Sequence, residues 1–156
     1  MYAAASPRGL VRLELPGPQA EARMAVWLAL HFPRAARRSG VSPILRKAAT
    51  ELEAYFTGGL TSFSVPLDLR GTPFQLAVWK AVQAIPYNET RTYGEIARAV
   101  GRPKAVRAVG AAQAANPLPI LIPCHRVIGA DGTLTGYGGG LEIKRWLLEH
   151  EAEIGR

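Results

Sequence analysis

The spacing of apolar residues predicts a short β-hairpin at the start of the chain. Residues Tyr2–Ser6 and Leu10–Leu15 flank the turn Pro7-Arg8-Gly9, and the second segment alternates apolar and polar side chains as a half-buried strand does. A later segment, Thr61–Leu69, also has an extended pattern. We therefore expect a small sheet in the first part of the chain.

Two helices are expected to accompany this sheet. Residues Gln19–His31 repeat apolar side chains at helical spacing. A second helix begins after Ser42, which can cap it, with Pro43 at its first position, and Gly58-Gly59 ends it. The expected buried faces are Ala22, Val26, Ala29 and Leu30 in the first helix, and Ile44, Leu45, Ala48, Leu52, Tyr55 and Phe56 in the second.

The pattern becomes mostly helical beyond residues 66–71. Thr72-Pro73-Phe74-Gln75 and Thr92-Tyr93-Gly94-Glu95 both have the sequence of a capping box, in which the first and fourth residues cap a helix reciprocally. They predict helices that end near Ile85 and Val100. The fold class is therefore mixed α/β (α+β), with residues 1–66 as an N-terminal structural domain and residues 67–156 as a C-terminal domain.

Two further helices complete the C-terminal part. The turn Gly101-Arg102-Pro103 leads into a helix from Lys104 to about Ala115, and the pair forms either a helix-turn-helix or an ordinary helical hairpin. The last helix, Glu142–Ile154, is expected to turn Ile143, Trp146, Leu147 and Leu148 inward.

Composition and charge narrow the class of protein. The chain has 48% hydrophobic residues, enough for a core, and one cysteine, which excludes an internal disulfide and a thiolate-rich zinc site. We find no signal peptide and no apolar run of membrane-spanning length, so we expect a cytoplasmic protein with no membrane partner.

The net charge of the chain is +7, and its basic residues are unevenly distributed. Around the predicted helix-turn-helix only Glu95 opposes a basic cluster that favours nucleic acid as partner: Arg91, Arg98, Arg102, Lys104 and Arg107. The alternative is a background preference for arginine over lysine.

The candidate nucleophile is the single cysteine, in the proline-rich segment Asn116–Val127. A free thiol has a pKa of about 8.5 and needs a base to act near neutral pH. His125 follows Cys124 directly, and Glu151 is a carboxylate that could fix the tautomer of its imidazole. From these residues alone, the commoner outcomes are that Cys124 is a small buried apolar residue and that Glu151 is a solvated carboxylate. The chemistry would be acyl transfer, which ends in hydrolysis, or alkyl transfer, which leaves a stable thioether.

Several motifs in order resemble the O6-alkylguanine-DNA alkyltransferase family. Pro123-Cys124-His125-Arg126-Val127 carries the resemblance, together with the motifs that precede and follow it: Thr72–Gln75, Tyr93–Ala97, Arg107–Gly110, Asn116-Pro117 and Tyr137–Gly140. The resemblance covers about Leu67 to Glu151. It implies a trimmed, ribonuclease-H-like N-terminal domain, and a C-terminal DNA-binding and alkyl-acceptor domain with a winged helix-turn-helix.

The resemblance also implies a role for each motif residue. Cys124 would take the alkyl group irreversibly from O6 of a flipped guanine, with His125, Glu151, Asn116 and Tyr93 assisting. The residues implied to contact DNA, in the minor groove of the duplex, are Arg102, Lys104, Arg107, Ala108, Gly110 and Arg126. Those implied to line the substrate pocket are Pro119, Val127, Tyr137, Gly138 and Gly139. The protein would act as a monomer on double-stranded DNA containing O6-alkylguanine, without cofactor or metal.

This sequence departs from the family pattern at a few positions. Gly138 stands where many members have serine, and Ala114 where some have a basic residue. Two alternatives stay open. A non-catalytic DNA-binding protein, either a damage sensor or a helix-turn-helix regulator, predicts binding that does not need Cys124. A cysteine hydrolase predicts turnover without a stable adduct.

Overall fold

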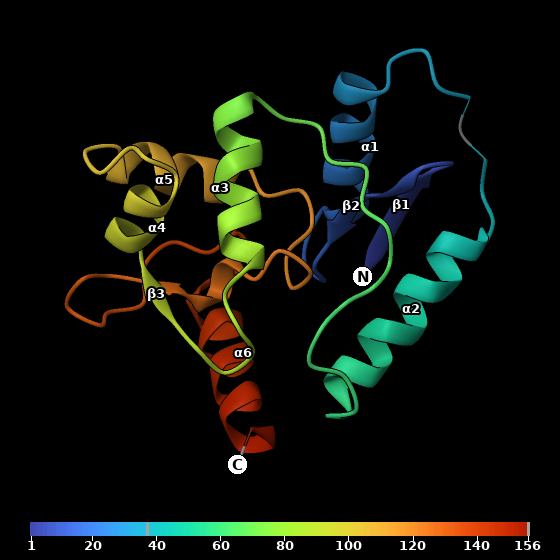
Figure 1. Cartoon of the computed structure of the whole chain (residues 1–156). Helices are drawn as coiled ribbons and strands as arrows, with labels where there is room; N and C mark the ends of the chain where they lie inside the picture. The colour runs from blue at the N-terminus through green and yellow to red at the C-terminus, as the bar shows by residue number, and fades with distance from the viewer. Residues whose placement is uncertain (37, 156) are drawn as a thin grey trace. The chain divides into compact units, whose positions relative to one another are not determined.

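The structure is a computed structural model that describes residues 1–36 and 38–155 (Figure 1). Residues 37 and 156, the second of which ends the predicted C-terminal domain, lie outside the described residues. The chain divides into two compact units, Met1–Arg70 and Gly71–Arg156. The division falls after the predicted position at residues 66–67, because the extended segment stays with the first unit. Leu10 donates its N–H to the Pro66 carbonyl at 2.8 Å and accepts from the Asp68 N–H at 2.9 Å.

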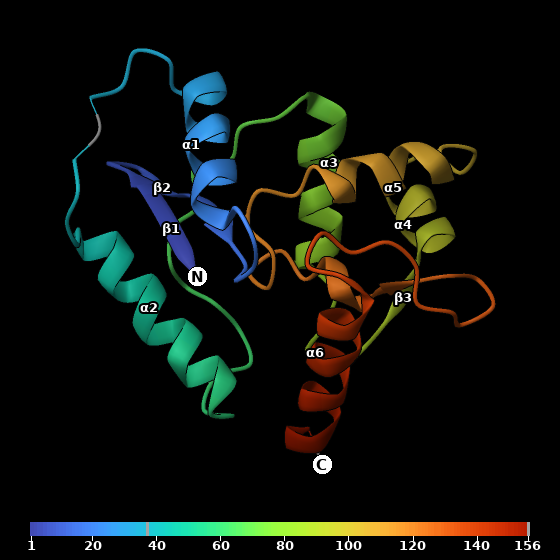
Figure 2. The ribbon, with the colours of Figure 1, turned by 180° about the vertical axis from the view of Figure 1, so that it is seen from behind.

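The first unit is built on an antiparallel hairpin of β1 (Tyr2–Ser6) and β2 (Gly9–Glu14). Two helices, α1 (Ala20–His31) and α2 (Pro43–Phe56), pack against these strands (Figures 1 and 2). Gly9 permits the close approach of the returning segment, since a Cβ there would lie 2.6 Å from the carbonyl carbon of Leu67. The hairpin, both helices and the extended return were all predicted.

Helix α2 follows its local sequence signals. The Ser42 side chain accepts a hydrogen bond from the Leu45 N–H at 3.2 Å, and Pro43 occupies the first helical position. Ala48, Leu52 and Tyr55 are buried on one face, as expected.

The predicted buried face of α1 is wrong. Val26 and Leu30 are 62% and 73% exposed, while Ala20 and Met24 are buried. This helix carries apolar residues on all sides, so periodicity alone cannot choose its inward face. Polar anchors choose it: Arg23 Nε donates to the Glu14 carboxylate of β2 at 3.1 Å, and the Arg12 guanidinium lies 5.3 Å from the centre of a Trp27 ring.

The second unit is mostly helical. It comprises α3 (Pro73–Gln83), β3 (Arg91–Thr92), α4 (Tyr93–Ala99), α5 (Val106–Ala114), a 3-10 turn η1 (Cys124–Arg126), β4 (Val127–Ile128) and α6 (Leu141–Ile154). Helices α3, α4 and α5 pack together, and α6 packs against η1 (Figure 1). Val78, Trp79 and Val82 of α3 are buried, and the Trp79 Nε1–H donates to the Ala112 carbonyl of α5 at 2.8 Å.

Both predicted capping boxes are present. In each, the threonine side chain accepts from the backbone N–H three residues on, and the side chain of that residue accepts from the threonine N–H. The second box has a consequence for the site, because Thr92 also ends β3. This strand pairs in parallel with β4, Arg91 opposite Val127 and Thr92 opposite Ile128. No local pattern in the sequence predicts this pairing.

Two details of the predicted helices need correction. Helix α5 begins at Val106 rather than Lys104, because Arg102–Ala105 forms a turn closed by a 2.8 Å bond from the Ala105 N–H to the Arg102 carbonyl. In α6, Trp146 is 49% exposed and lies against His150, whereas Lys144, Leu147 and Glu151 are the buried residues.

The mixed α/β fold class is confirmed, while the winged and ribonuclease-H-like details stay predictions. Across the described residues, every helix is too short or too polar to cross a membrane.

Candidate active site

The cysteine lies at the end of a segment held by one asparagine. Asn116 Nδ2 donates to the Ile122 carbonyl at 2.9 Å and lies 3.2 Å from Cys124 Sγ, and Asn116 Oδ1 accepts from the Leu118 N–H at 2.9 Å. Between these contacts Ile120 has φ +76°, a left-handed conformation that is costly for a β-branched residue. The buried loop therefore holds the sulfur beside an amide donor at the cost of a strained backbone at Ile120.

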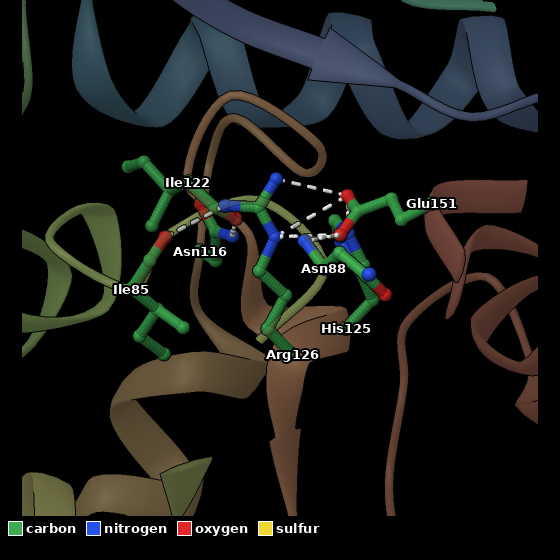
Figure 3. A network of polar contacts seen from close by, with 7 residues as sticks. All are labelled: Ile85, Asn88, Asn116, Ile122, His125, Arg126 and Glu151. Atoms are coloured by element: carbon green, nitrogen blue, oxygen red, sulfur yellow. Dashed lines mark hydrogen bonds and ion pairs between the residues drawn. The ribbon is translucent and has the colours of Figure 1, made fainter. Parts of the chain in front are cut away.

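His125 and Glu151 meet as predicted from the residues. His125 Nε2 lies 2.8 Å from Glu151 Oε1, and both side chains are fully buried. Glu151 also accepts from the backbone N–H of Asn88 at 3.1 Å (Figure 3). Because Glu151 engages Nε2, the ring nitrogen left for other chemistry is Nδ1, which has no hydrogen-bond partner among the described residues.

Arg126 was predicted to contact DNA, and this prediction is wrong. The residue is 5% exposed, and its Nε and Nη2 donate to the Glu151 carboxylate at distances of 2.9–3.2 Å. Its Nη1 donates to the Ile85 carbonyl at 2.7 Å (Figure 3). The guanidinium also lies 5.5 Å from the centre of the Tyr87 ring. Arg126 neutralises Glu151 inside the protein, so it is a positioning residue of the site.

Lys144 is a member of the site that the sequence analysis missed. It is fully buried, and its Nζ donates to the Val127 carbonyl at 2.6 Å and to the Thr135 carbonyl at 2.8 Å. Thr135 O also accepts from the Tyr93 hydroxyl at 3.2 Å. Lys144 thus ties β4 to the loop before Tyr137. Glu151 was a signal for it, since an inward Glu151 places Leu147 and Lys144 on the same helical face.

Burial sets the protonation states of the two reacting groups. It raises the pKa of Cys124, although the Asn116 hydrogen bond and the charge of Lys144 act in the opposite direction. Burial lowers the pKa of His125, against the stabilising effect of Glu151. The resting site therefore holds a neutral thiol beside a neutral imidazole that can accept its proton.

The predicted pocket residues lie around this centre to different degrees. Val127 is fully buried in β4, and Pro119 is half-buried. The Tyr137 hydroxyl is buried without a partner among the described residues. Burial raises the pKa of Tyr137, and a charge on Cys124 raises it further. Gly138 is exposed and Gly139 half-buried, with open space around Gly138.

The predicted DNA-contacting residues, apart from Arg126, gather on α5 and the turn before it. Arg102, Lys104, Arg107 and Ala108 are all exposed. Gly110 is half-buried, and a Cβ there would lie 4.0 Å from Cε1 of Tyr93.

Among the described residues, no cluster of three or more His, Cys, Asp or Glu residues could hold a metal ion.

Comparison with known proteins decides the family. The sequence profile described as 6-O-methylguanine DNA methyltransferase, DNA binding domain, matches residues 73–153, more than half of the chain. The chain belongs to the 6-O-methylguanine DNA methyltransferase family. This confirms the resemblance inferred from the motifs around Cys124.

Individual members of this family extend the likeness. The chain is 64% identical over 104 residues to methylated-DNA–protein-cysteine methyltransferase of Mycobacterium bovis, covering 67% of this chain and 63% of that protein. It is 60% identical over 106 residues to the protein of that name from Methanosarcina acetivorans, covering 68% of each. The match thus spans less than two thirds of the mycobacterial relative's length.

A solved structure is similar over almost the whole chain. The crystal structure of Mycobacterium tuberculosis OGT in complex with DNA matches with a TM-score of 0.78 at 46% identity, covering 97% of this chain and 86% of that one. The likeness extends to the first unit, which the matched profile does not include.

Proposed function

We propose that this methyltransferase-family chain repairs DNA by moving an alkyl group from O6 of guanine to Cys124. The observation that carries the proposal is a pair of buried contacts on adjacent residues of η1, Cys124 Sγ with Asn116 and His125 with Glu151. It supplies a thiol, a neutral base and a carboxylate that orients the base.

The transfer is a displacement at the alkyl carbon. The thiol proton passes to His125 Nδ1, directly or through a water, and the sulfur forms a bond to the alkyl carbon. The bond from that carbon to O6 breaks, and its electron pair leaves with the guanine. Tyr93 donates a proton or hydrogen bond at N3 of the leaving base. The product is a thioether that water does not cleave, so each molecule reacts once.

The target base must leave the duplex before it can reach a buried sulfur. Flipping a base costs a few kcal/mol, and an inserted side chain recovers part of the unstacking cost. Exposed Arg107 on α5 takes this role, and Ala108 and Gly110 allow the helix to approach the minor groove. Lys104 and Arg102 contact phosphates. Pro119, Val127 and the loop Tyr137–Gly139 enclose the base, with a backbone N–H of the loop toward O6.

We infer the remaining properties from the same reaction. The chain needs no cofactor, acts as a monomer on double-stranded DNA, and works in the compartment that holds the chromosome, the cytoplasm in a prokaryote. The crystal structure of the mycobacterial relative with DNA supports DNA as the partner.

The deciding experiment is the intact mass of the protein after incubation with duplex DNA that contains one O6-methylguanine. We expect a gain of one methylene unit on Cys124, saturating at one per molecule, and no gain for Cys124→Ala, which still binds the DNA. Bound DNA without a mass change would point to a damage sensor or regulator. Repeated turnover without an adduct would point to a hydrolase.

A further inference from the structure

Several buried side-chain atoms of the second unit lack a hydrogen-bond partner that a ligand could supply. Gln113 Nε2, His125 Nδ1 and the Tyr137 hydroxyl are buried and have no hydrogen-bond partner within the described ranges. A buried polar group without a partner destabilises a fold, so such groups persist where a ligand supplies the partner. In the proposed reaction His125 Nδ1 takes the thiol proton, and Tyr137 belongs to the loop that encloses the base. Gln113 has no explanation so far.

Gln113 lies on the side of α5 that faces the site. Its backbone carbonyl accepts from the N–H of Asn116 at 3.0 Å, and the Asn116 side chain reaches Cys124 Sγ. Gly110, three residues earlier on the helix, faces the Tyr93 ring. Residues three apart share a helical face. The Gln113 side chain therefore belongs to the surface between Tyr93 and Asn116, and it is 8% exposed, unlike Arg107 on the outer face.

The chemistry of the side chain defines its ligand. A primary amide offers donors and an acceptor in one plane, which suits the edge of a flat heterocycle. The ring nitrogens N3 and N7 of a purine accept hydrogen bonds in the plane of the ring. N7 lies on the edge of adenine that proteins recognise with glutamine or asparagine. An apolar side chain at position 113 would fill the same volume without leaving an unpaired donor in the free protein.

We propose that Gln113 is a substrate-binding residue whose Nε2–H donates to N7 of the flipped base, the ring acceptor that Tyr93 leaves free. This inference rests on the proposed function. Gln113 then recognises the heterocycle itself, whereas the exposed basic residues of α5 recognise the duplex. The unpaired amide is the structural cost that the free protein bears for this contact.

The test compares methyl transfer by the wild type, Gln113→Met and Gln113→Leu on one O6-methylguanine duplex. We expect a roughly tenfold lower second-order rate for both variants, the effect of one lost hydrogen bond, with an unchanged salt dependence. Gln83→Met makes the same change at an exposed position of α3 and should react as the wild type. Unchanged rates for both Gln113 variants would overturn the inference. A wild type that transfers nothing would instead overturn the proposed function.

Two further readouts separate substrate binding from a structural role. Replacing an unpaired buried amide by methionine should raise the melting temperature. A lower melting temperature together with slower transfer would show that Gln113 supports the fold, and would overturn the inference. The second readout uses duplexes with the 3-deaza or the 7-deaza analogue of the base. Gln113→Met should cause no further loss on the 7-deaza substrate; an undiminished loss on that substrate would overturn the inference.

Discussion

Arginines in two regions of the second unit have opposite environments. On the α4–α5 pair, Arg102 and Arg107 extend into solvent. In η1, Arg126 is buried, and Nε, Nη1 and Nη2 all donate to internal acceptors. The exposed region offers its charge to a partner, while the buried region uses its charge to pair with Glu151 beside His125. The residue type and its charge are the same in both regions. The role of each arginine therefore depends on whether it is buried and on whether a carboxylate lies within reach.

The largest expected effect separates these two arginines by stability. Arg126→Met leaves the Glu151 charge buried without its cation, and should lower the free energy of unfolding by about 3–5 kcal/mol. Arg107→Met should change it by less than about 0.5 kcal/mol. Urea unfolding of both variants measures the difference. Equal stabilities would mean that Arg126 contributes no more than a surface arginine.

Glu151→Gln sharpens the comparison at the level of chemistry. The amide keeps the shape of Glu151 but can present a donor to His125 Nε2, which would stabilise the wrong tautomer. We expect the single-turnover rate of methyl transfer to fall roughly 100-fold, a typical contribution of acid–base catalysis. Glu149→Gln, on the exposed side of α6, is the control and should react normally. An unchanged rate in a folded Glu151→Gln variant would remove this carboxylate from the mechanism.

The exposed region should respond to salt. Lys104→Gln removes one proposed phosphate contact, and should lower the slope of log binding constant against log salt by about one. Lys47→Gln removes a partly exposed lysine of α2 in the first unit, and serves as the matched control. Binding of undamaged duplex at several salt concentrations measures both slopes. An identical slope for Lys104→Gln and the wild type would contradict a phosphate contact at this residue.

The smallest effect is a pH dependence confined to the buried region. Burial lowers the pKa of His125, so below the ordinary value of about 6.5 the unfolded chain binds a proton that the folded chain does not. The free energy of unfolding should therefore decrease as the pH falls from about 7 to 5.5, by at most about 1.4 kcal/mol per pH unit. Urea unfolding at several pH values tests this. His125→Gln should lose the dependence, and a slope that survives this change must come from another group.

The helices that begin with their own caps could be predicted closely from the sequence. Ser42, Thr72 and Thr92 each accept a hydrogen bond from an N–H three residues on, as expected. These signals depend on four consecutive residues, so distant parts of the chain cannot override them. The contact of His125 with Glu151 was also predicted, because a base near a thiol needs a carboxylate to orient it.

The wrong or missing predictions concern features that depend on contacts between segments far apart in the sequence. The face of α1 depends on Glu14 of β2, and the β3–β4 pair joins Arg91 to Val127, which no local pattern reveals. The resemblance implied that Arg126 contacts DNA, and its burial was not visible in the sequence. Lys144 was missed for the same reason, since a lysine on a terminal helix is usually solvated.

The buried lysine of α6 makes the fold visible to amine-reactive reagents. The chain has four lysines, Lys47, Lys80, Lys104 and Lys144, and of these Lys144 is fully buried. Acylation followed by peptide mapping should modify the first three within the labelling pulse and spare Lys144. Modification of Lys144 then requires the second unit to open, and its rate reports that opening. The acylation rate of Lys144 thus measures how often the second unit opens around the site, and the experiment needs no introduced probe.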